Sequence, residues 1–366
     1  EVSPEVPRVA DDVEVRSIST LLEPAGRVEG HPVRLAENAG IGFIGCYVLG
    51  MGFVVDVAEA QEWIAADPRN AEVLFPYLNG EDLNNRPDAS ASRWVIDFND
   101  RTEAEASIYE LPMQRATEVV RPERMRNKRK ARRDAWWQFA ERASGMRRAI
   151  APMSEVLVIA RVSKTVMPLR VPTGQVPSEA CVVFATDSYS DQAVLSSSLH
   201  QLWAITYGSG LRNDPRYTPS DVFETFPRPE GTAELEEIGR TLDHERREIM
   251  TRRGLGLTKL YNRVNDPEIH IQEDEDIGRL REIHVDLDRC VAAAYGWGDV
   301  RLGHGHHVYR KVTRWTVCPP ARVELLDLLL EEDHRRGGSK EPAGSRSGRW
   351  RGSPERAAPP AATLFE

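Results

Sequence analysis

The sequence predicts a chain of the α/β (α+β) class, in which a sheet-containing domain precedes a mostly helical C-terminal domain. Three β-rich runs, at 93–98, 155–164 and 179–186, support the first half of this prediction. The composition shifts at about Pro229, and beyond it apolar residues recur at helical spacing over 277–291. At 366 residues the chain is long enough for two or three domains.

The first hundred residues predict short elements joined by turns. Residues 1–40 read as a strand or two plus a linker and resemble the tail of a preceding domain. From Ile41 the run IGFIGCYVLGMGFVV is too rich in glycine for a central helix, which favours buried β structure with tight turns. Asp56 is expected to cap a helix over 57–66, and Asn79-Gly80 predicts a turn.

Further along, helices and loops alternate. One long charged helix is predicted over roughly 102–148, and a second is expected to begin at Ser190 or Asp191. A loop then leads to a short helix beginning at Pro219, and a last helix begins at the prolines 319–320. The final thirty residues are rich in Gly, Ser, Pro and Arg and are expected to be disordered.

Charge is distributed unevenly along the chain. The net charge is -9, but residues 101–170 hold 16 Lys and Arg against 8 Asp and Glu, so this stretch carries +8 and the remainder -17. A basic middle between acidic ends fits a protein that holds a polyanion on one face, although a solvated helix would explain a charge run as simply. Trp136 and Trp137, which follow the basic run, are expected to anchor it on the core.

Several classes of protein and site are disfavoured. No run of eighteen apolar residues predicts a membrane span, and no signal peptide is recognisable. Four scattered cysteines predict neither zinc nor a disulfide framework and fit a reducing cytoplasm. Gly303-His304-Gly305-His306-His307 lacks further ligands at metal-binding spacing, so a surface turn is the preferred interpretation.

Two polar clusters are candidate contact surfaces. In the first, the apolar strand at 155–164 ends in Arg161, Ser163, Lys164 and Thr165, with Arg170 shortly after. Such groups donate hydrogen bonds to base edges and phosphates. The second cluster comprises Arg212, Asn213, Arg216, Tyr217, Thr218 and Ser220, beside the helix N-terminus predicted at Pro219, which would suit a phosphate. Two solvent-exposed loops remain the alternative.

The motifs of methyl transfer are missing. A class I methyltransferase needs a glycine-rich turn after its first strand, and an amino-methylating DNA enzyme needs an Asn/Asp/Ser-Pro-Pro-aromatic loop. Cys318-Pro319-Pro320-Ala321 lacks both the polar and the aromatic residue of that loop, and IGFIGCYVLGMG has the wrong glycine spacing. The sequence therefore offers no catalytic, cofactor-binding or metal-ligating residue.

The order of several motifs nevertheless resembles one family over residues 35–310. VLGMGFVV, LFPYLNGEDLNNRP, RWVIDF, AWWQFAERASGMRRAI, EVLVIARVSK and LHQLWAITYGSGLRNDPRYTPSDVFETFPRP are similar to the C-terminal half of type IIL and phage-defence adenine-specific DNA methyltransferases. The resemblance implies an exit from the methyltransferase core at 1–40, a mixed-sheet target-recognition domain at 41–228, a helical region at 229–335 and a disordered tail at 336–366. S-adenosylmethionine would be bound by an upstream core, outside this chain.

The two clusters are assigned roles, and the resemblance bears on the first of them, because the segment after the strand at 155–161 resembles a variable reading segment of the family, which points to Ser163, Lys164, Thr165, Met167 and Arg170. Base-reading residues are expected at the strand end, namely Arg161, Ser163, Lys164, Thr165, Met167 and Arg170. Backbone contacts are expected from Arg126, Lys128, Arg129, Lys130, Arg212, Asn213, Arg216, Tyr217, Thr218 and Ser220. The expected partners are double-stranded DNA and the upstream core. A free-standing specificity subunit and a protein-interaction module remain alternatives, and the DNA sequence recognised stays open.

Overall fold

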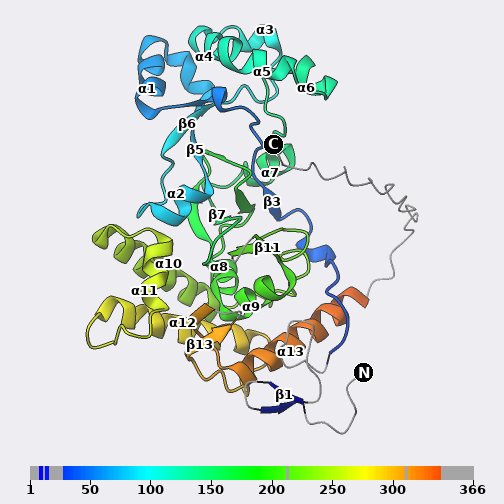
Figure 1. Cartoon of the computed structure of the whole chain (residues 1–366), viewed down its shortest axis with the longest axis vertical. Coiled ribbons are helices and arrows are strands. Elements are labelled where there is room, and N and C mark those ends of the chain that lie inside the picture. The colour runs from blue at the N-terminus through cyan, green and yellow to red at the C-terminus, as the bar shows by residue number, and fades with distance from the viewer. Residues whose placement is uncertain (1–7, 11–12, 16–27, 212–213, 310–311, 339–366) are drawn as a thin grey trace, which may run out of the picture.

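The computed structural model describes residues 8–10, 13–15, 28–211, 214–309 and 312–338. The molecule is elongated, with helices from 57–66 and 103–134 at one end, two β-sheets and the short helix 80–85 in the middle, and helices from 233–338 at the other end (Figure 1). Near the chain start, β1 (Arg8–Ala10) and β2 (Val13–Val15) form an antiparallel pair. The predicted class, a mixed-sheet part followed by a mostly helical part, is confirmed.

The first sheet is antiparallel throughout. Its strands are β3 (Gly42–Ile44), β7 (Glu155–Ala160), β8 (Leu169–Pro172) and β10 (Cys181–Phe184), in the order β3-β10-β7-β8. β7 reads EVLVIA, and its last five side chains are buried because both of its faces are covered. β7 and β10 lie within the runs predicted at 155–164 and 179–186, and each strand is shorter than its run.

The second sheet is mixed. Its strands are β4 (Val54–Val55), β5 (Leu74–Leu78), β6 (Arg93–Ile96) and β9 (Val176–Pro177), in the order β4-β6-β5-β9. Only β5 and β9 are parallel. Because β9 lies between β8 and β10 in the sequence, the chain passes from the first sheet to the second and back over 172–181. The acid after β6, Asp97, is buried and accepts a 2.7 Å bond from Arg147.

The single helix predicted over 102–148 is wrong. The chain instead forms α3 (Glu103–Ala106), α4 (Glu110–Arg115), a π-helical turn (Ala116–Val120), α5 (Arg121–Met125), α6 (Lys130–Asp134) and α7 (Ser144–Ile150). A straight helix of that length would extend for roughly 70 Å. Breaking it lets Trp136, Phe139 and Met146 pack into one core cluster. Trp136 is 3% exposed, so its predicted anchoring role is confirmed.

Helix starts were predicted with mixed success. α1 (Val57–Ala66) begins after Asp56, as predicted. The turn predicted at Asn79-Gly80 is wrong, because Asn79 is the N-cap of α2 (Gly80–Asn85) and forms a capping box with Asp82. The helix predicted from Ser190 or Asp191 is two helices, α8 (Tyr189–Ser196) and α9 (Ser198–Tyr207). Ser188 caps the first and Ser197 the second.

The second half is mainly helical but contains two hairpins. The helices are α10 (Ala233–Arg253), α11 (Leu257–Val264), α12 (Glu275–Ala294) and α13 (Pro319–Gly338). The hairpins are β11 (Ser209–Leu211) with β12 (Asp214–Arg216), and β13 (Gly305–Tyr309) with β14 (Val312–Thr316). The His-rich surface turn predicted at 303–307 therefore leads into a strand. Helix α13 includes the first residues of the predicted tail, and the rest of that tail lies outside the described residues.

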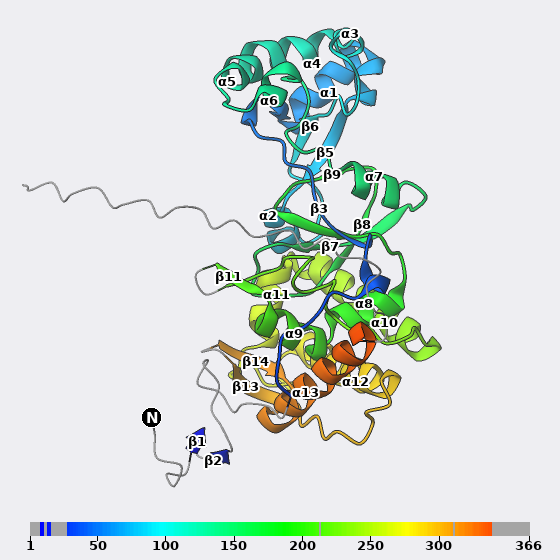
Figure 2. The same ribbon diagram turned by 90° about the vertical axis from the view of Figure 1, so that its right-hand side faces the viewer.

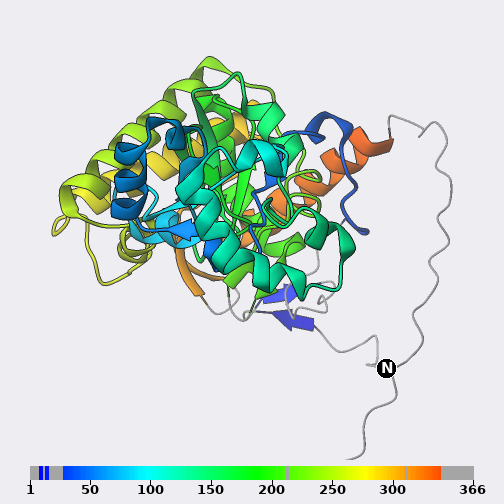
Figure 3. The same ribbon diagram turned by 90° about the horizontal axis from the view of Figure 1, so that it is seen from above.

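Two hydrophobic clusters hold the fold together, and both cross the boundary predicted near Pro229. One joins the two sheets to Ile249, Leu260 and Leu280, and the other joins β7, β10, α8 and α9 to α10, α12 and α13. The predicted domain division remains a prediction, but its two parts share their cores. Residues 28–38 run beside α13 (Figure 3). Val33 N donates to Asp333 Oδ2 at 2.8 Å.

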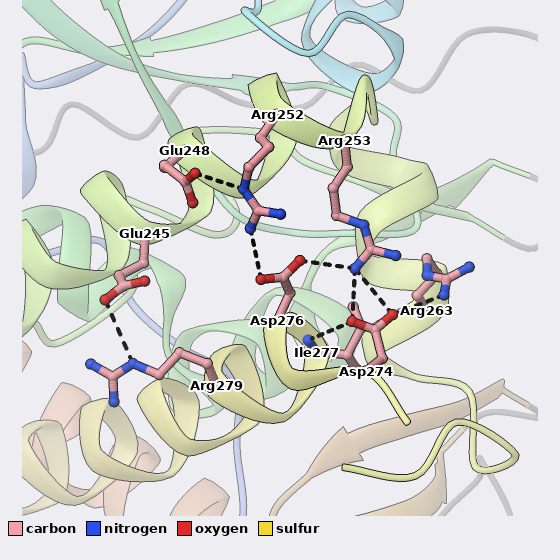
Figure 4. Close-up of polar contacts among 9 residues, drawn as sticks. All are labelled: Glu245, Glu248, Arg252, Arg253, Arg263, Asp274, Asp276, Ile277 and Arg279. Carbon is pink, nitrogen blue, oxygen red and sulfur yellow. Dashed lines mark hydrogen bonds and ion pairs between the residues drawn. The ribbon is translucent and has the colours of Figure 1, made fainter. Parts of the chain in front are cut away.

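An ion-pair network joins α10, α11 and the start of α12 (Figure 4). Asp274, the N-cap of α12, accepts hydrogen bonds from Arg253 and Arg263, each at 2.8 Å, and from Ile277 N at 3.3 Å. Arg252 joins Glu248 on its own helix to Asp276 on α12. Burial of Asp274 would raise its pKa, but the bonds from the two arginines lower it to about 2.

Candidate nucleic-acid interface

The two polar clusters predicted from the sequence meet at the end of β7. Arg161 N donates to Ala180 O at 2.8 Å, and Arg161 O accepts from Tyr217 N at 2.7 Å. Val162 forms an isolated antiparallel bridge with Arg216. The strand end is therefore held between the start of β10 and the β11–β12 hairpin, so side chains from both predicted clusters share one surface.

A cavity of about 680 Å³, here termed the strand-end cavity, opens at this point. Lys164 and Arg216 in its lining are exposed, and Arg161 is half-buried. None of these three cations makes an ion pair with a described residue. Desolvation lowers the pKa of Arg161, and the neighbouring Arg216 lowers it further, while Glu179 opposes both effects. The cavity thus gathers three cations beside the carboxylates of Glu81 and Glu179, and none of the three cations is held in an ion pair with a described residue.

A second cavity, here termed the helix-side cavity, has a volume of about 890 Å³. Its lining extends from the end of β3 to residues 124–144 and again includes Arg161 and Glu179, so the two cavities share a wall. Arg132 lies over the Tyr47 ring at 5.8 Å. The two cavities together are called the basic groove. Helices α5 and α6 and the β11 hairpin project toward the same side of the molecule (Figure 2).

The basic run predicted to contact a DNA backbone lies between Arg124 and Ala131, which both line the helix-side cavity, and it is here termed the rim. Its side chains are all exposed: Arg126, Lys128, Arg129 and Lys130. Lys130 pairs with Asp134, whereas the other three make no ion pair with a described residue. Arg124 is different, because it is buried and its Nη2 donates to Val48 O at 2.7 Å and to Gln138 O at 3.1 Å. Arg124 therefore joins Val48 to Gln138, and Gln138 lines the helix-side cavity.

Four of the six predicted base-reading residues face inward. Ser163, Thr165, Met167 and Arg170 are all less than 9% exposed. Arg170 belongs to β8, and its guanidinium lies 3.9 Å from the centre of the Tyr189 ring and donates to Asp187 O at 2.9 Å. Pairing of β8 with β7 directs this side chain onto α8 instead of into the groove. In this structure Arg170 joins sheet to helix, which corrects the role expected from its position in the sequence.

Only part of the second predicted cluster reaches the groove. Arg212 and Asn213 lie outside the described residues. Tyr217 is buried, with its hydroxyl 2.9 Å from His200 Nε2. Thr218 and Ser220 are half-buried, and the latter's carbonyl accepts from Arg34 Nε. Residues 219–225 form turns, so the helix N-terminus predicted at Pro219 is wrong and Arg216 alone lines the cavity.

Three residues that line the groove were not identified from the sequence: Tyr47, Asn84 and Glu179. Glu179 precedes β10, whose first residue pairs with Ala160, the last residue of β7. In an antiparallel pair, residues before one strand lie beside residues after the other. That rule would have placed Glu179 beside Arg161 once β7 and β10 were taken as neighbours. Asn84 on α2 contacts Ser163 through a 2.9 Å hydrogen bond, which no local pattern indicates.

Metal and membrane features are not found in the described part of the chain. It contains no group of three or more His, Cys, Asp or Glu side chains arranged to hold a metal ion. His304, from the His-rich run, instead binds Asp288 at 2.8 Å. No described helix combines the length and the apolar character that crossing a membrane requires.

Comparisons with known proteins find a similar fold and a matching family. Of seventeen matching chains among solved structures, one is the type IIL restriction-modification enzyme MmeI in complex with DNA. Its TM-score is 0.61 at 16% identity, and the match covers 89% of this chain but 39% of that one. No curated protein sequence matches the chain. The family model for the MmeI target recognition domain matches residues 46–230. Because this match covers half of the sequence, the chain belongs to the MmeI target-recognition-domain family.

Proposed function

We propose that the chain reads the target sequence in duplex DNA on behalf of a type IIL-like restriction-modification enzyme. The observation that carries this proposal is the basic groove, where Arg161, Lys164 and Arg216 converge and none of them forms an ion pair with a described residue. All the lining residues of the groove except Ile44, Gly45 and Thr258 lie within the segment that matches the target-recognition family. Unpaired cations lining a cavity gain free energy when a polyanion replaces their counterions.

The exposure of each cation suggests its role. Lys164, Arg216 and the rim residues Arg126, Lys128 and Arg129 are exposed, which suits phosphate contacts that position the duplex. Arg161 is half-buried between two structural elements, so its orientation is restricted in the way that a base contact requires. We assign target readout to Arg161 and its neighbours and backbone contact to the rim.

The chain spans 39% of the length of the MmeI chain, so methyl transfer belongs to our proposal for a larger enzyme. In that enzyme an upstream core would bind S-adenosylmethionine and methylate an adenine that is flipped out of the duplex. The helix-side cavity does not suit that cofactor. Arg124, Arg132, Arg142 and Arg161 line it, and they would repel the positively charged sulfonium group. We keep residues 41–228 as the recognition domain and 229–335 as its helical support.

A salt titration tests the proposal. The whole chain should bind a pool of duplex DNA at low salt and release it as salt rises, measured by fluorescence anisotropy. Replacing Lys128 and Arg129 by Gln should weaken binding on all sequences and reduce the salt slope by about 1 per lost contact. Arg289→Gln, an exposed change on α12 outside the groove, is the matched control and should leave binding unchanged. Indifference to DNA at every salt concentration would refute the proposal.

Methyl transfer is tested separately. We expect adenine methylation only when an upstream methyltransferase core is added to the chain. Activity of the chain alone would contradict the assignment of the chemistry to that core.

A further inference from the structure

Glu179 presents an unsatisfied acceptor at the wall shared by the two cavities. It lies between β9 and β10 and lines both the strand-end and the helix-side cavity. Its Oε2 atom is enclosed by protein atoms and accepts no hydrogen bond. Its carboxylate makes no ion pair with any described residue. A half-buried carboxylate without a donor is costly, so a ligand that brings a donor to this wall gains binding free energy.

Arg161 is the matching unsatisfied donor. Its Nε is also enclosed and has no partner, and its Nη1 reaches only the backbone carbonyl of Glu179, at 3.5 Å. The two side chains line the same two cavities, yet they form no ion pair within 4.0 Å of each other. Both side chains are only half-buried, so each keeps part of its polar surface open to the cavities, and a donor and an acceptor are presented on one wall.

The carboxylate restricts which part of DNA can bind there. A phosphate would satisfy Arg161 but would be repelled by Glu179, so the ligand must present a donor next to its acceptors. The major-groove edge of a G·C pair does so, with O6 and N7 of guanine as acceptors and N4 of cytosine as donor. The major-groove edge of adenine offers one acceptor, N7, beside the N6 amino donor. A guanidinium with two donors can therefore make only one hydrogen bond to adenine, against two to guanine.

We propose that Arg161 and Glu179 together read one G·C base pair, with Arg161 donating to guanine and Glu179 accepting from the cytosine N4 amino group. Lys164 and Arg216, both exposed on the same cavity, then hold the flanking phosphates. This assignment rests on the proposed DNA recognition and names the base pair read at that site.

Selection from a random duplex library tests the assignment. The full chain and each variant are incubated with the library at low salt, and the bound DNA is sequenced. The parent chain should select a motif that contains a G·C pair. Glu179→Gln and Arg161→Lys should each relax that same position, reducing its preference about tenfold or more. Glu282→Gln is the matched control, since Glu282 is an exposed carboxylate on α12 that lines neither cavity, and the motif that this variant selects should equal that of the parent.

The outcomes separate this inference from the proposed function. An unchanged motif for Glu179→Gln, relaxation of an A·T position, or relaxation of different positions by the two variants would overturn the inference and leave DNA recognition intact. Failure of the parent chain to select any motif would overturn both. If Glu179→Gln does not fold, as judged from its thermal melting, Arg161→Lys still decides, because it must relax a G·C position.

Discussion

Asp274 is expected to be the main electrostatic support of the helical region. Its side chain is 10% exposed, caps α12 and accepts hydrogen bonds from Arg253 on α10 and Arg263 on α11 (Figure 4). Asp274→Asn keeps the size of the side chain and a residue type that caps helices well, but removes the negative charge. The variant therefore isolates the charged contacts with the two arginines from the helix cap.

The size of the effect follows from the pKa. The arginine bonds lower the pKa of Asp274 from 3.8 to about 2, and each unit is worth about 1.4 kcal/mol. The charge should therefore contribute about 2 kcal/mol to the free energy of unfolding at pH 7. Because the folded-state pKa is the lower one, this contribution is complete above about pH 4 and disappears as the pH falls toward 2. At pH 3 roughly 1 kcal/mol should remain.

Urea unfolding, followed by circular dichroism at 222 nm, measures the difference between Asp274→Asn and the parent chain. The expected loss is about 2 kcal/mol at pH 7 and about half of that at pH 3. Glu248→Gln, which removes an exposed partner of Arg252, should cost well under 1 kcal/mol and serves as the control. A loss for Asp274→Asn that is equally large at both pH values would refute the electrostatic account.

Three further predictions follow from burial. Arg170→Met should lower the free energy of unfolding by about 2 kcal/mol, because it strips donors from Asp187 O, while the selected DNA motif stays the same. A changed motif at unchanged stability would show that the residue reads bases. Gly239→Ala should lower the free energy of unfolding by about 3 kcal/mol, because the added Cβ would lie 2.0 Å from Tyr189 O. The melting temperature should fall accordingly, and a melting temperature equal to the parent's would contradict the tight contact. Burial raises the pKa of Cys46 to about 11 and that of Cys181 to about 12. Neither thiol should therefore react with a disulfide reagent at pH 8, and fast labelling of either would contradict its burial.

Local patterns predicted those elements whose formation depends on nearby residues. The apolar run of β7, the helix after Asp56 and the proline-initiated α13 were all recognisable in this way. The helix predicted over 102–148 failed because charge and propensity continue through it. What breaks it is the packing of Trp136, Phe139 and Met146 onto a common core, and the sequence does not display that constraint locally.

The same distinction between local patterns and tertiary packing applies to the candidate site. The sequence located the end of β7 and the later polar cluster, but it did not reveal which of their side chains would be buried. Arg170 faces inward because β8 pairs with β7, and Tyr217 because its hydroxyl meets His200 from α9. Glu179 escaped notice because its importance depends on the neighbouring strand. Inward or outward orientation in these cases is a property of tertiary pairing.

The way in which Arg161 is held has a consequence for altering specificity. Its amide and its carbonyl are both bound by backbone atoms, from Ala180 and Tyr217, and these bonds do not depend on which side chain it carries. Under the proposed function, a substitution at Arg161 would therefore exchange the chemical group presented to a duplex without moving the backbone that presents it. A new sequence preference at that position would then be accessible through a single amino-acid change, without refolding.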